Sequence, residues 1–352
     1  MNLDDHTSFT QWDPQNLLAE IANLPDQLVA AWEKGQSLFL APWLGVRQVV
    51  IAAMGTSALA ADLLTTYLTP TCQLPIVVVR NYNLPAWVNG PETLLICTSY
   101  SGDTEEILSA FEQAVSRDCR ILVITTGGQL AAAAQKFGAD LWPMEPCSLM
   151  GTAVGSVFGL LLAAFSRLEL IPDTNEDLVE ARAAMVAQQV TLGAAVPVMQ
   201  NEAKRLAGQC VGRWLAVFGS DHLAPVARYW KIQLNHLAKT WAQFEILPEA
   251  DHNTLVGVQH PSQMIGQTML LFLRSQSCHP RNQLRAEITK EYFMLEGLGT
   301  DFFNAQGDTL LAQIWTALHF GDYLAYYLAM AYGVQPAILD TVEGLKAYLR
   351  EE

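Results

Sequence analysis

The sequence predicts an α/β protein made of two three-layer αβα sandwiches, each with a parallel β-sheet between layers of helices. Short apolar, β-branched runs alternate with helical patterns, and this alternation pauses near the middle of the chain and then restarts. Near-continuous apolar strands are typical of parallel sheets covered on both faces. Hydrophobic residues make up 51% of the 352 residues and charged residues only 16%, which suits two sizeable cores. We place the domains at residues 1–190 and 191–352.

The first domain is expected to contain a five-stranded sheet. Helical patterns lie between the strands, so right-handed crossovers would place helices on both faces. The expected strands are residues 48–55, 74–82, 93–99, 120–126 and 140–144, and the helical patterns are 58–68, 105–115 and 130–137.

Residues 149–166, LMGTAVGSVFGLLLAAFS, form an uncharged run that approaches the length of a membrane span. The run is rich in Gly, Ala, Ser and Thr, and Arg167 and Glu169 follow it at once. We therefore interpret it as a helix buried between neighbours.

The second domain repeats the strand–helix alternation after helical patterns at 176–197 and 201–210. A loose internal repeat is visible, because IAAMGTSALAADLL and LAVFGSDHLAPVA share a strand–Gly–small–polar–helix layout. The helix at 311–333 is apolar on most faces and should be central. The expected strands are 213–220, 240–248, 268–275 and 291–297, and a final amphipathic helix covers 338–350.

Composition excludes several classes of function. The net charge of −15 and the absence of basic runs argue against nucleic acid and against anionic membrane surfaces as partners. The six cysteines form no CxxC pair, and the His, Cys and carboxylate residues show no metal-ligand spacing. The N-terminus lacks the basic and apolar regions of a signal peptide. We expect a cytoplasmic protein with reduced thiols and without metal.

Two loops follow strands of the first sheet and open helices. MGTSA carries Gly55 and Ser57, and SYSGDT carries Ser99, Ser101 and Thr104. Helix N-termini offer unpaired N–H groups and a positive dipole end, and small hydroxyls add donors, so the pair of loops favours a phosphate site. The alternative is simple helix capping, in which Asp103 and Glu106 form a capping box.

These residues resemble the sugar isomerase (SIS) domain. SYSGDTEEILSAFEQA is similar to that family's phosphate loop, S-x-S-G-[ND]-T-x-E-T, and AAMGTSALAADLL is similar to its first loop. The second half resembles the bifunctional phosphoglucose/phosphomannose isomerase branch through NEAKRLA, FGSDHLAPVARYWKIQLNHLAK, LPEADHNTLVG and HFGDYLAYYLAMAYGVQPAILDTVEGLKAYL.

The resemblance implies two SIS domains in a homodimer whose sugar-phosphate sites are completed across the interface. It implies aldose–ketose interconversion through an enediol, with no cofactor and no metal. The implied phosphate-binding residues are Gly55, Ser57, Ser99, Ser101 and Thr104.

The implied ring-opening residue is His252, which stands in PEADHN where the family motif reads P-E-x-N-H-N. A histidine can give and take a proton near neutral pH. Glu249 in the same loop is a backup base, and Lys346 is a further substrate-site candidate. Asp251 is expected to be structural, and His319 to be a hydrogen-bonded core residue.

Three positions depart from the family pattern. His236 stands in QLNHLAK where Q-L-N-E-N-A-K has its glutamate base, Gly151 replaces the arginine of P-R-x-A-x-G, and Ala337 lies in QPAI where the family often reads D-P-T-P. His236 is either a replacement base or the mark of a catalytically weak or inactive paralogue that senses or sequesters a sugar phosphate. Another phosphosugar, such as a pentose or heptose phosphate, is a third possibility.

Overall fold

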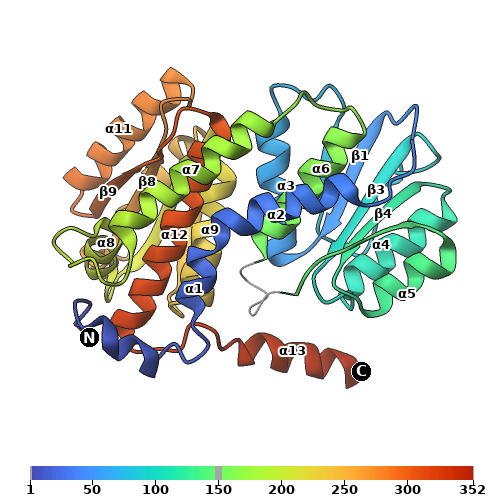
Figure 1. The fold of residues 1–352 in the computed structure, drawn as a ribbon. Helices are drawn as coiled ribbons and strands as arrows, with labels where there is room; N and C mark the ends of the chain where they lie inside the picture. The colour runs from blue at the N-terminus through green and yellow to red at the C-terminus, as the bar shows by residue number, and fades with distance from the viewer. Residues whose placement is uncertain (1, 147–152, 352) are drawn as a thin grey trace. The chain divides into compact units, whose positions relative to one another are not determined.

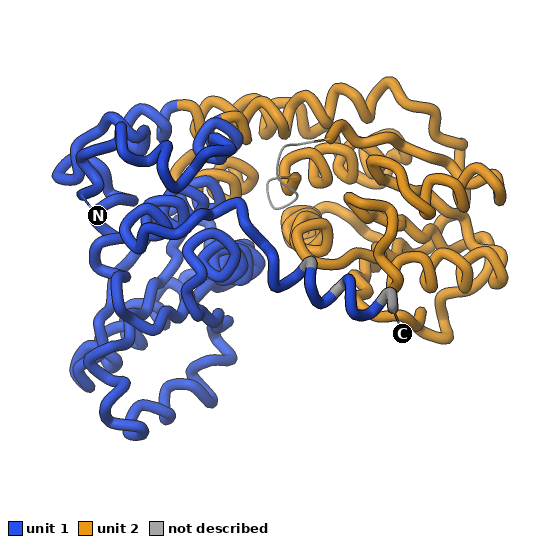
Figure 2. Tube along the Cα trace, turned by 90° about the horizontal axis from the view of Figure 1, so that it is seen from below, with its two compact units in different colours: residues 1–22, 187–305, 317–352 blue, residues 23–186, 306–316 orange. Residues whose placement is uncertain are grey.

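The computed structural model describes residues 2–146 and 153–351. The chain forms two compact units (Figure 2). Unit 1 consists of Met1–Ala22, Ala187–Ala305 and Ala317–Glu352, and unit 2 consists of Asn23–Val186 and Gln306–Thr316. Two helices, α7 (Asn175–Leu192) and α12 (Leu310–Tyr332), pass from one unit into the other.

Unit 2 contains a five-stranded parallel sheet in the order β2-β1-β3-β4-β5. Its strands β1, β3 and β4 are labelled in Figure 1. All five strands expected from the sequence are present, with ends that differ by a few residues. Helices α4 and α5 cover one face of the sheet, where Leu95, Cys97, Phe111 and Leu130 share a buried cluster. The strands are β1 (Gln48–Ala53), β2 (Ile76–Val79), β3 (Thr93–Ser99), β4 (Arg120–Thr125) and β5 (Asp140–Pro143), and the helices are α3 (Gly55–Leu68), α4 (Glu105–Ser116), α5 (Gly128–Phe137) and α6 (Val154–Arg167).

The described part of the long apolar run, α6, is a buried helix that packs against α2 (Leu24–Ser37). Glycines allow this close approach: a Cβ on Gly155 would lie 2.7 Å from the Gln27 side chain, and one on Gly159 would lie 2.6 Å from the Leu28 carbonyl. The interpretation as a buried helix is confirmed over 154–166, while residues 149–152 lie outside the described part. Among the described residues, no helix is both long and apolar enough to cross a membrane.

Unit 1 contains a four-stranded parallel sheet in the order β7-β6-β8-β9. The order matches the first four strands of unit 2, so the internal repeat seen in the sequence is also a repeat of topology. The strands are β6 (Trp214–Ser220), β7 (Ala242–Leu247), β8 (Thr268–Arg274) and β9 (Gly299–Asn304), and helices α9 (Ala224–His236) and α11 (Pro280–Leu295) lie between them in sequence.

The expected strand at 291–297 is wrong. These residues form the end of α11, and the fourth strand is β9. The helix begins with Pro280 after His279, whose ring accepts a hydrogen bond from the Arg281 amide. Its buried residues are Ala286, Thr289 and Phe293, a helical spacing that overrides the strand preference of the local aromatic residues.

The remaining elements connect and flank the sheets. Every residue of α12 from 311 to 330 is buried, as expected for a central helix. The final helix α13 covers Asp340–Glu351. The others are η1 (His6–Gln11), α1 (Leu17–Ala22), α8 (Glu202–Cys210), η3 (Asp221–Leu223), η4 (Glu249–His252), η5 (Thr254–Val256) and α10 (Ser262–Ile265).

Candidate functional site

The first predicted loop ends β1 and opens α3 without capping. Gly55 begins the helix with a φ of +52°, a conformation that favours glycine. Within the described chain, the N-cap residue Met54 makes no side-chain capping bond, and the first turn carries no acidic residue. Ser57 lies buried in that turn. The first-turn amides and the positive end of the helix dipole are therefore available to an anion.

In the second loop, residues 99–104, the side-chain hydroxyls form hydrogen bonds within the loop itself. Ser99 Oγ lies 2.8 Å from Thr104 Oγ1 and accepts a hydrogen bond from the Gly102 amide at 3.1 Å. Ser101 Oγ accepts one from the Asp103 amide at 3.2 Å. Ser99 is buried whereas Ser101 is exposed. This arrangement gives Ser99 the role of holding the loop and leaves Ser101 accessible.

The two loops lie at the same edge of one sheet. β1 and β3 are neighbours, and Ala53 pairs with Thr98 at their carboxyl ends. Thr104 is the N-cap residue of α4 and, within the described chain, makes no side-chain capping bond. Two helix N-termini without side-chain caps thus begin side by side beyond the ends of adjacent parallel strands, where open α/β sheets bind their ligands.

The carboxylate of Asp103 accepts a hydrogen bond from the first turn of α5 and does not cap α4. The alternative of a capping box between Asp103 and Glu106 is wrong, because Thr104 occupies the N-cap position. Asp103 Oδ1 instead accepts a hydrogen bond from the Gln129 amide, at 3.0 Å, in the first turn of α5. Its negative charge therefore stabilises α5.

A third loop, between β4 and α5, was missed by the sequence reasoning. Its backbone lies directly against the second loop: the Leu130 amide donates to the Gly102 carbonyl at 2.9 Å, and the Thr126 amide donates to the Tyr100 carbonyl at 3.2 Å. A Cβ on Gly102 would lie 1.9 Å from the Gly127 carbonyl oxygen. The signal for this contact was the pair of glycines, 127 and 128, immediately after a strand.

His252 and Glu249 lie in unit 1, in the short helix η4 that follows β7. Both side chains are exposed. Asn253 Nδ2 donates to Glu249 Oε1 at 3.4 Å, and Asn253 Oδ1 accepts from the Thr254 amide at 2.5 Å. The loop therefore presents one imidazole and one carboxylate to solvent, both able to exchange protons.

His236 is the last residue of α9, also in unit 1. Burial lowers the pKa of its imidazole below the ordinary value, and the nearby Lys239 and Lys231 ammonium groups lower it further. Its Nδ1 atom is buried without a hydrogen-bond partner among the described residues. The ring is therefore neutral at pH 7, and a neutral imidazole can accept a proton.

Two of the three departures from the family pattern lie close together. Lys239 Nζ donates to the His236 carbonyl, to the Pro336 carbonyl at 3.3 Å and to the Ile338 carbonyl at 2.5 Å. The lysine thus joins the end of α9 to the segment that contains Ala337. Lys346 lies in α13.

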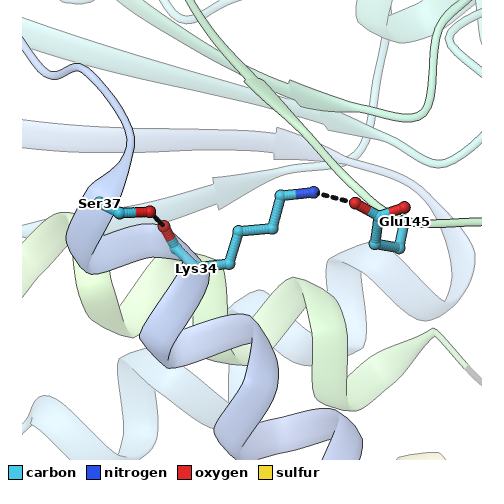
Figure 3. A network of polar contacts seen from close by, with 3 residues as sticks. All are labelled: Lys34, Ser37 and Glu145. Atoms are coloured by element: carbon cyan, nitrogen blue, oxygen red, sulfur yellow. Dashed lines mark hydrogen bonds and ion pairs between the residues drawn. The ribbon is translucent and has the colours of Figure 1, made fainter.

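Gly151, the third departure, lies outside the described residues. The described residues that follow β5 end at residue 146, and one of them, Glu145, forms an ion pair with α2. Lys34 Nζ of α2 lies 2.5 Å from Glu145 Oε1, and the Lys34 carbonyl accepts from Ser37 Oγ (Figure 3). The lysine lowers the pKa of the Glu145 carboxyl.

The predicted site residues therefore fall into two groups. The five residues predicted to bind phosphate lie in unit 2, whereas His236, His252, Glu249 and Lys346 lie in unit 1. His319, expected in the core, is buried, and its Nε2 atom lies 3.0 Å from the Ile21 carbonyl oxygen.

Comparison with known proteins finds similarity to phosphoglucose isomerases both in the family model and in individual relatives. Residues 199–349 match the family model of the bacterial phospho-glucose isomerase C-terminal SIS domain. A bifunctional phosphoglucose/phosphomannose isomerase from Caldicellulosiruptor bescii is 32% identical over 95% of this chain and 99% of its own length. Another from Aquifex aeolicus is 29% identical over 89% of this chain and 92% of its own length.

Solved structures share the fold. A hypothetical protein from Thermus thermophilus superimposes with a TM-score of 0.74 at 17% identity, covering 99% of this chain and 95% of its own. The similarity in sequence to the first of these isomerases, from Caldicellulosiruptor bescii, extends over 95% of this chain. The chain belongs to the family of bifunctional phosphoglucose/phosphomannose isomerases.

Proposed function

We propose that this protein interconverts glucose 6-phosphate or mannose 6-phosphate with fructose 6-phosphate through an enediol. One observation carries the phosphate half of the proposal: two helix N-termini without side-chain caps begin beyond adjacent strands β1 and β3, within loops rich in hydroxyls. The names of the relatives supply the sugar half, because they are phosphoglucose/phosphomannose isomerases.

His252 is assigned to ring opening. In that step the C1–O5 bond breaks, the ring oxygen gains a proton, and the C1 hydroxyl loses one as the carbonyl forms. An exposed imidazole suits both transfers, because its two ring nitrogens can donate and accept protons.

His236 is assigned to the transfer of a proton between C1 and C2. A base removes the proton from C2 of the open-chain aldose while O1 gains a proton, which gives the enediol. The O2 hydroxyl then loses its proton as the base returns the first proton to C1, so the ketose forms with no net gain or loss of protons or electrons and without an oxidant. The lowered pKa of His236 favours this role, because its imidazole is already in the form that accepts a proton. Glu249 is the alternative base.

The replacements of the family residues favour a second candidate function, binding of a sugar phosphate with little or no turnover. A general base contributes about 10²–10⁴-fold in rate. A group that stabilises developing charge contributes about 10²–10³-fold. In this chain His236 stands where the family has its glutamate base, and Gly151 stands where the family has its arginine. Each contribution to the rate would therefore have to come from a different residue.

We also propose a cytoplasmic homodimer with sites completed between subunits, as the family resemblance implies. Five cysteines in the described part of the chain are free thiols, as expected in a reducing compartment. The oligomeric state is measured by analytical ultracentrifugation, and a monomer at working concentration would contradict this part of the proposal.

The test is a coupled assay with fructose 6-phosphate and mannose 6-phosphate, together with a calorimetric titration. Wild type is compared with His236→Ala, His236→Glu and His252→Asn, and with His260→Asn as a control at an exposed histidine to which no role is assigned. Turnover that collapses in His236→Ala and His252→Asn, but not in the control, supports the isomerase. Binding without turnover, with activity appearing in His236→Glu, supports the binding function. Neither binding nor turnover with any hexose phosphate would overturn both.

A further inference from the structure

The loop that carries His252 is short and open to solvent. It follows β7 and consists of the two single-turn helices η4 and η5. Its hydrophobic anchor is Ala250, which is buried in the core cluster of unit 1, with Leu255 partly buried against the same cluster. Ala250 itself contributes little buried area, because its side chain is a single methyl group.

Asp251 supplies a polar anchor next to His252. Its Oδ2 atom lies 2.7 Å from Arg285 Nη1, and its Oδ1 atom accepts a hydrogen bond from Thr289 Oγ1 at 2.7 Å. The aspartate side chain is only 12% exposed. Both carboxylate oxygens are thus used, and the two partners hold the carboxylate from two directions, which restricts its orientation.

Both partners stand on α11, one helical turn apart. That helix is firmly seated: its Ala286 and Phe293 side chains belong to the same buried cluster as Phe218 of β6 and Phe272 of β8. Arg285 and Thr289 therefore connect the loop to a rigid part of the unit and not to another loop.

The sequence of this chain supports a specific pairing. In the motif P-E-x-N-H-N the fourth position is asparagine, and in PEADHN it is Asp251. An asparagine could accept from Thr289 but could not form an ion pair with Arg285, so the carboxylate adds a bond that the motif residue lacks.

We propose that Asp251 is a positioning residue, which fixes the imidazole of His252 for ring opening by attaching its loop to Arg285 and Thr289 on α11. The proposal rests on the role of His252 proposed above. It concerns placement alone, because Asp251 contacts Arg285 and Thr289 and is directed toward α11.

The experiment measures ring opening by itself. The interconversion of the α and β anomers of glucose 6-phosphate requires ring opening but no proton transfer at carbon, and two-dimensional exchange NMR measures its rate with the full-length protein. Asp251→Asn and Arg285→Met are compared with Arg285→Lys, which keeps the charge. Glu287→Gln is the matched control, because Glu287 also stands on α11 and lies 3.6 Å from Arg274, away from the loop. Hydrogen exchange of residues 249–256 and urea denaturation are measured on the same samples.

We expect Asp251→Asn and Arg285→Met to slow catalysed anomerisation about 10-fold, since small displacements of a reacting group cost large factors in rate. The concentration of glucose 6-phosphate at half-saturation should stay within about 2-fold of wild type, because the phosphate loops are untouched. Amide hydrogen exchange of residues 249–256 should become faster in Asp251→Asn and Arg285→Met. Arg285→Lys should retain part of the anomerisation rate that Arg285→Met loses.

Three results would overturn the proposal. They are an unchanged anomerisation rate in Asp251→Asn, a loss of the same size in Glu287→Gln, or loop exchange that does not respond to either variant. Wild type that fails to accelerate anomerisation would refute the role of His252 itself. The loop attachment is then judged by hydrogen exchange alone, so the two failures are distinguishable.

Discussion

Replacing Gly102 by alanine tests the close contact between the second loop, which belongs to the proposed phosphate site, and the third loop. Gly102 has a φ of +74°, and an added Cβ would lie 1.9 Å from the Gly127 carbonyl oxygen and 2.9 Å from Thr125 Oγ1. Gly90 is a matched control on the opposite end of β3: its φ is +75°, and no atom of the described chain lies within 4 Å of an added Cβ.

The expected magnitudes follow from this geometry. Alanine in a left-handed conformation costs about 1 kcal/mol at either position. In Gly102→Ala the Gly127 carbonyl must also move by about 1 Å before the contact becomes tolerable, and such overpacking costs a further 1–3 kcal/mol or so. We expect a loss of about 2–4 kcal/mol in the free energy of unfolding for Gly102→Ala and about 1 kcal/mol for Gly90→Ala. A 1 Å displacement of the loop should weaken fructose 6-phosphate binding by about 10²-fold.

Urea denaturation gives the free energies of unfolding, and titration calorimetry gives the affinities for fructose 6-phosphate. Equal losses of stability in the two variants would show that the loops do not approach as closely as the geometry indicates. A normal affinity in a folded Gly102→Ala protein would show that residues 99–104 are not part of the phosphate site. Either result would refute the reasoning.

Three further predictions concern buried polar groups. Ser99→Ala removes the hydroxyl that contacts Thr104 and should cost about 1–3 kcal/mol in urea denaturation together with a weaker affinity for fructose 6-phosphate; unchanged stability would contradict the role of Ser99. Burial lowers the pKa of His319 to about 4, so stability is full above pH 6.5 and falls as the pH drops; at pH 5 the loss is about 2 kcal/mol, and it should be absent in His319→Gln. Burial raises the pKa of Asp322, which accepts from Tyr229 Oη and Gln233 Nε2, to about 7, so its contribution is full at low pH and is lost as the pH rises toward 7. The stability of Asp322→Asn relative to wild type should therefore increase by about 2–3 kcal/mol between about pH 5 and pH 8, whereas a constant difference would contradict the raised pKa.

Local pattern explains what could be predicted in the first half of the chain. Both ends of the strand at 93–99 are predicted correctly. An apolar run with β-branched residues that ends at small polar residues is typical of a strand in a parallel sheet covered on both faces. The hydroxyls of the proposed phosphate loop are predicted from the same kind of local pattern, because they follow a strand and precede a helix in the sequence itself.

The strand expected at 291–297 was wrong because its residues are ambiguous locally. Tyr292 and Phe293 favour strands in isolation. The helical conformation places the Phe293 ring against Phe218 of β6, a residue more than seventy positions earlier in the chain. This distant contact favours helix α11 over a strand.

The sequence by itself predicted the two sheets apart from β9, the two loops that open α3 and α4, and the residue types at the family's positions. Tertiary structure alone decided what those residues touch: Asp103 reaches the Gln129 amide, and Lys239 reaches the Pro336 and Ile338 carbonyls. The reason is physical. Helix ends and strand patterns arise from neighbours in the chain, whereas a hydrogen bond between distant segments exists only once the core has brought them together, and its partner leaves no trace in the local sequence.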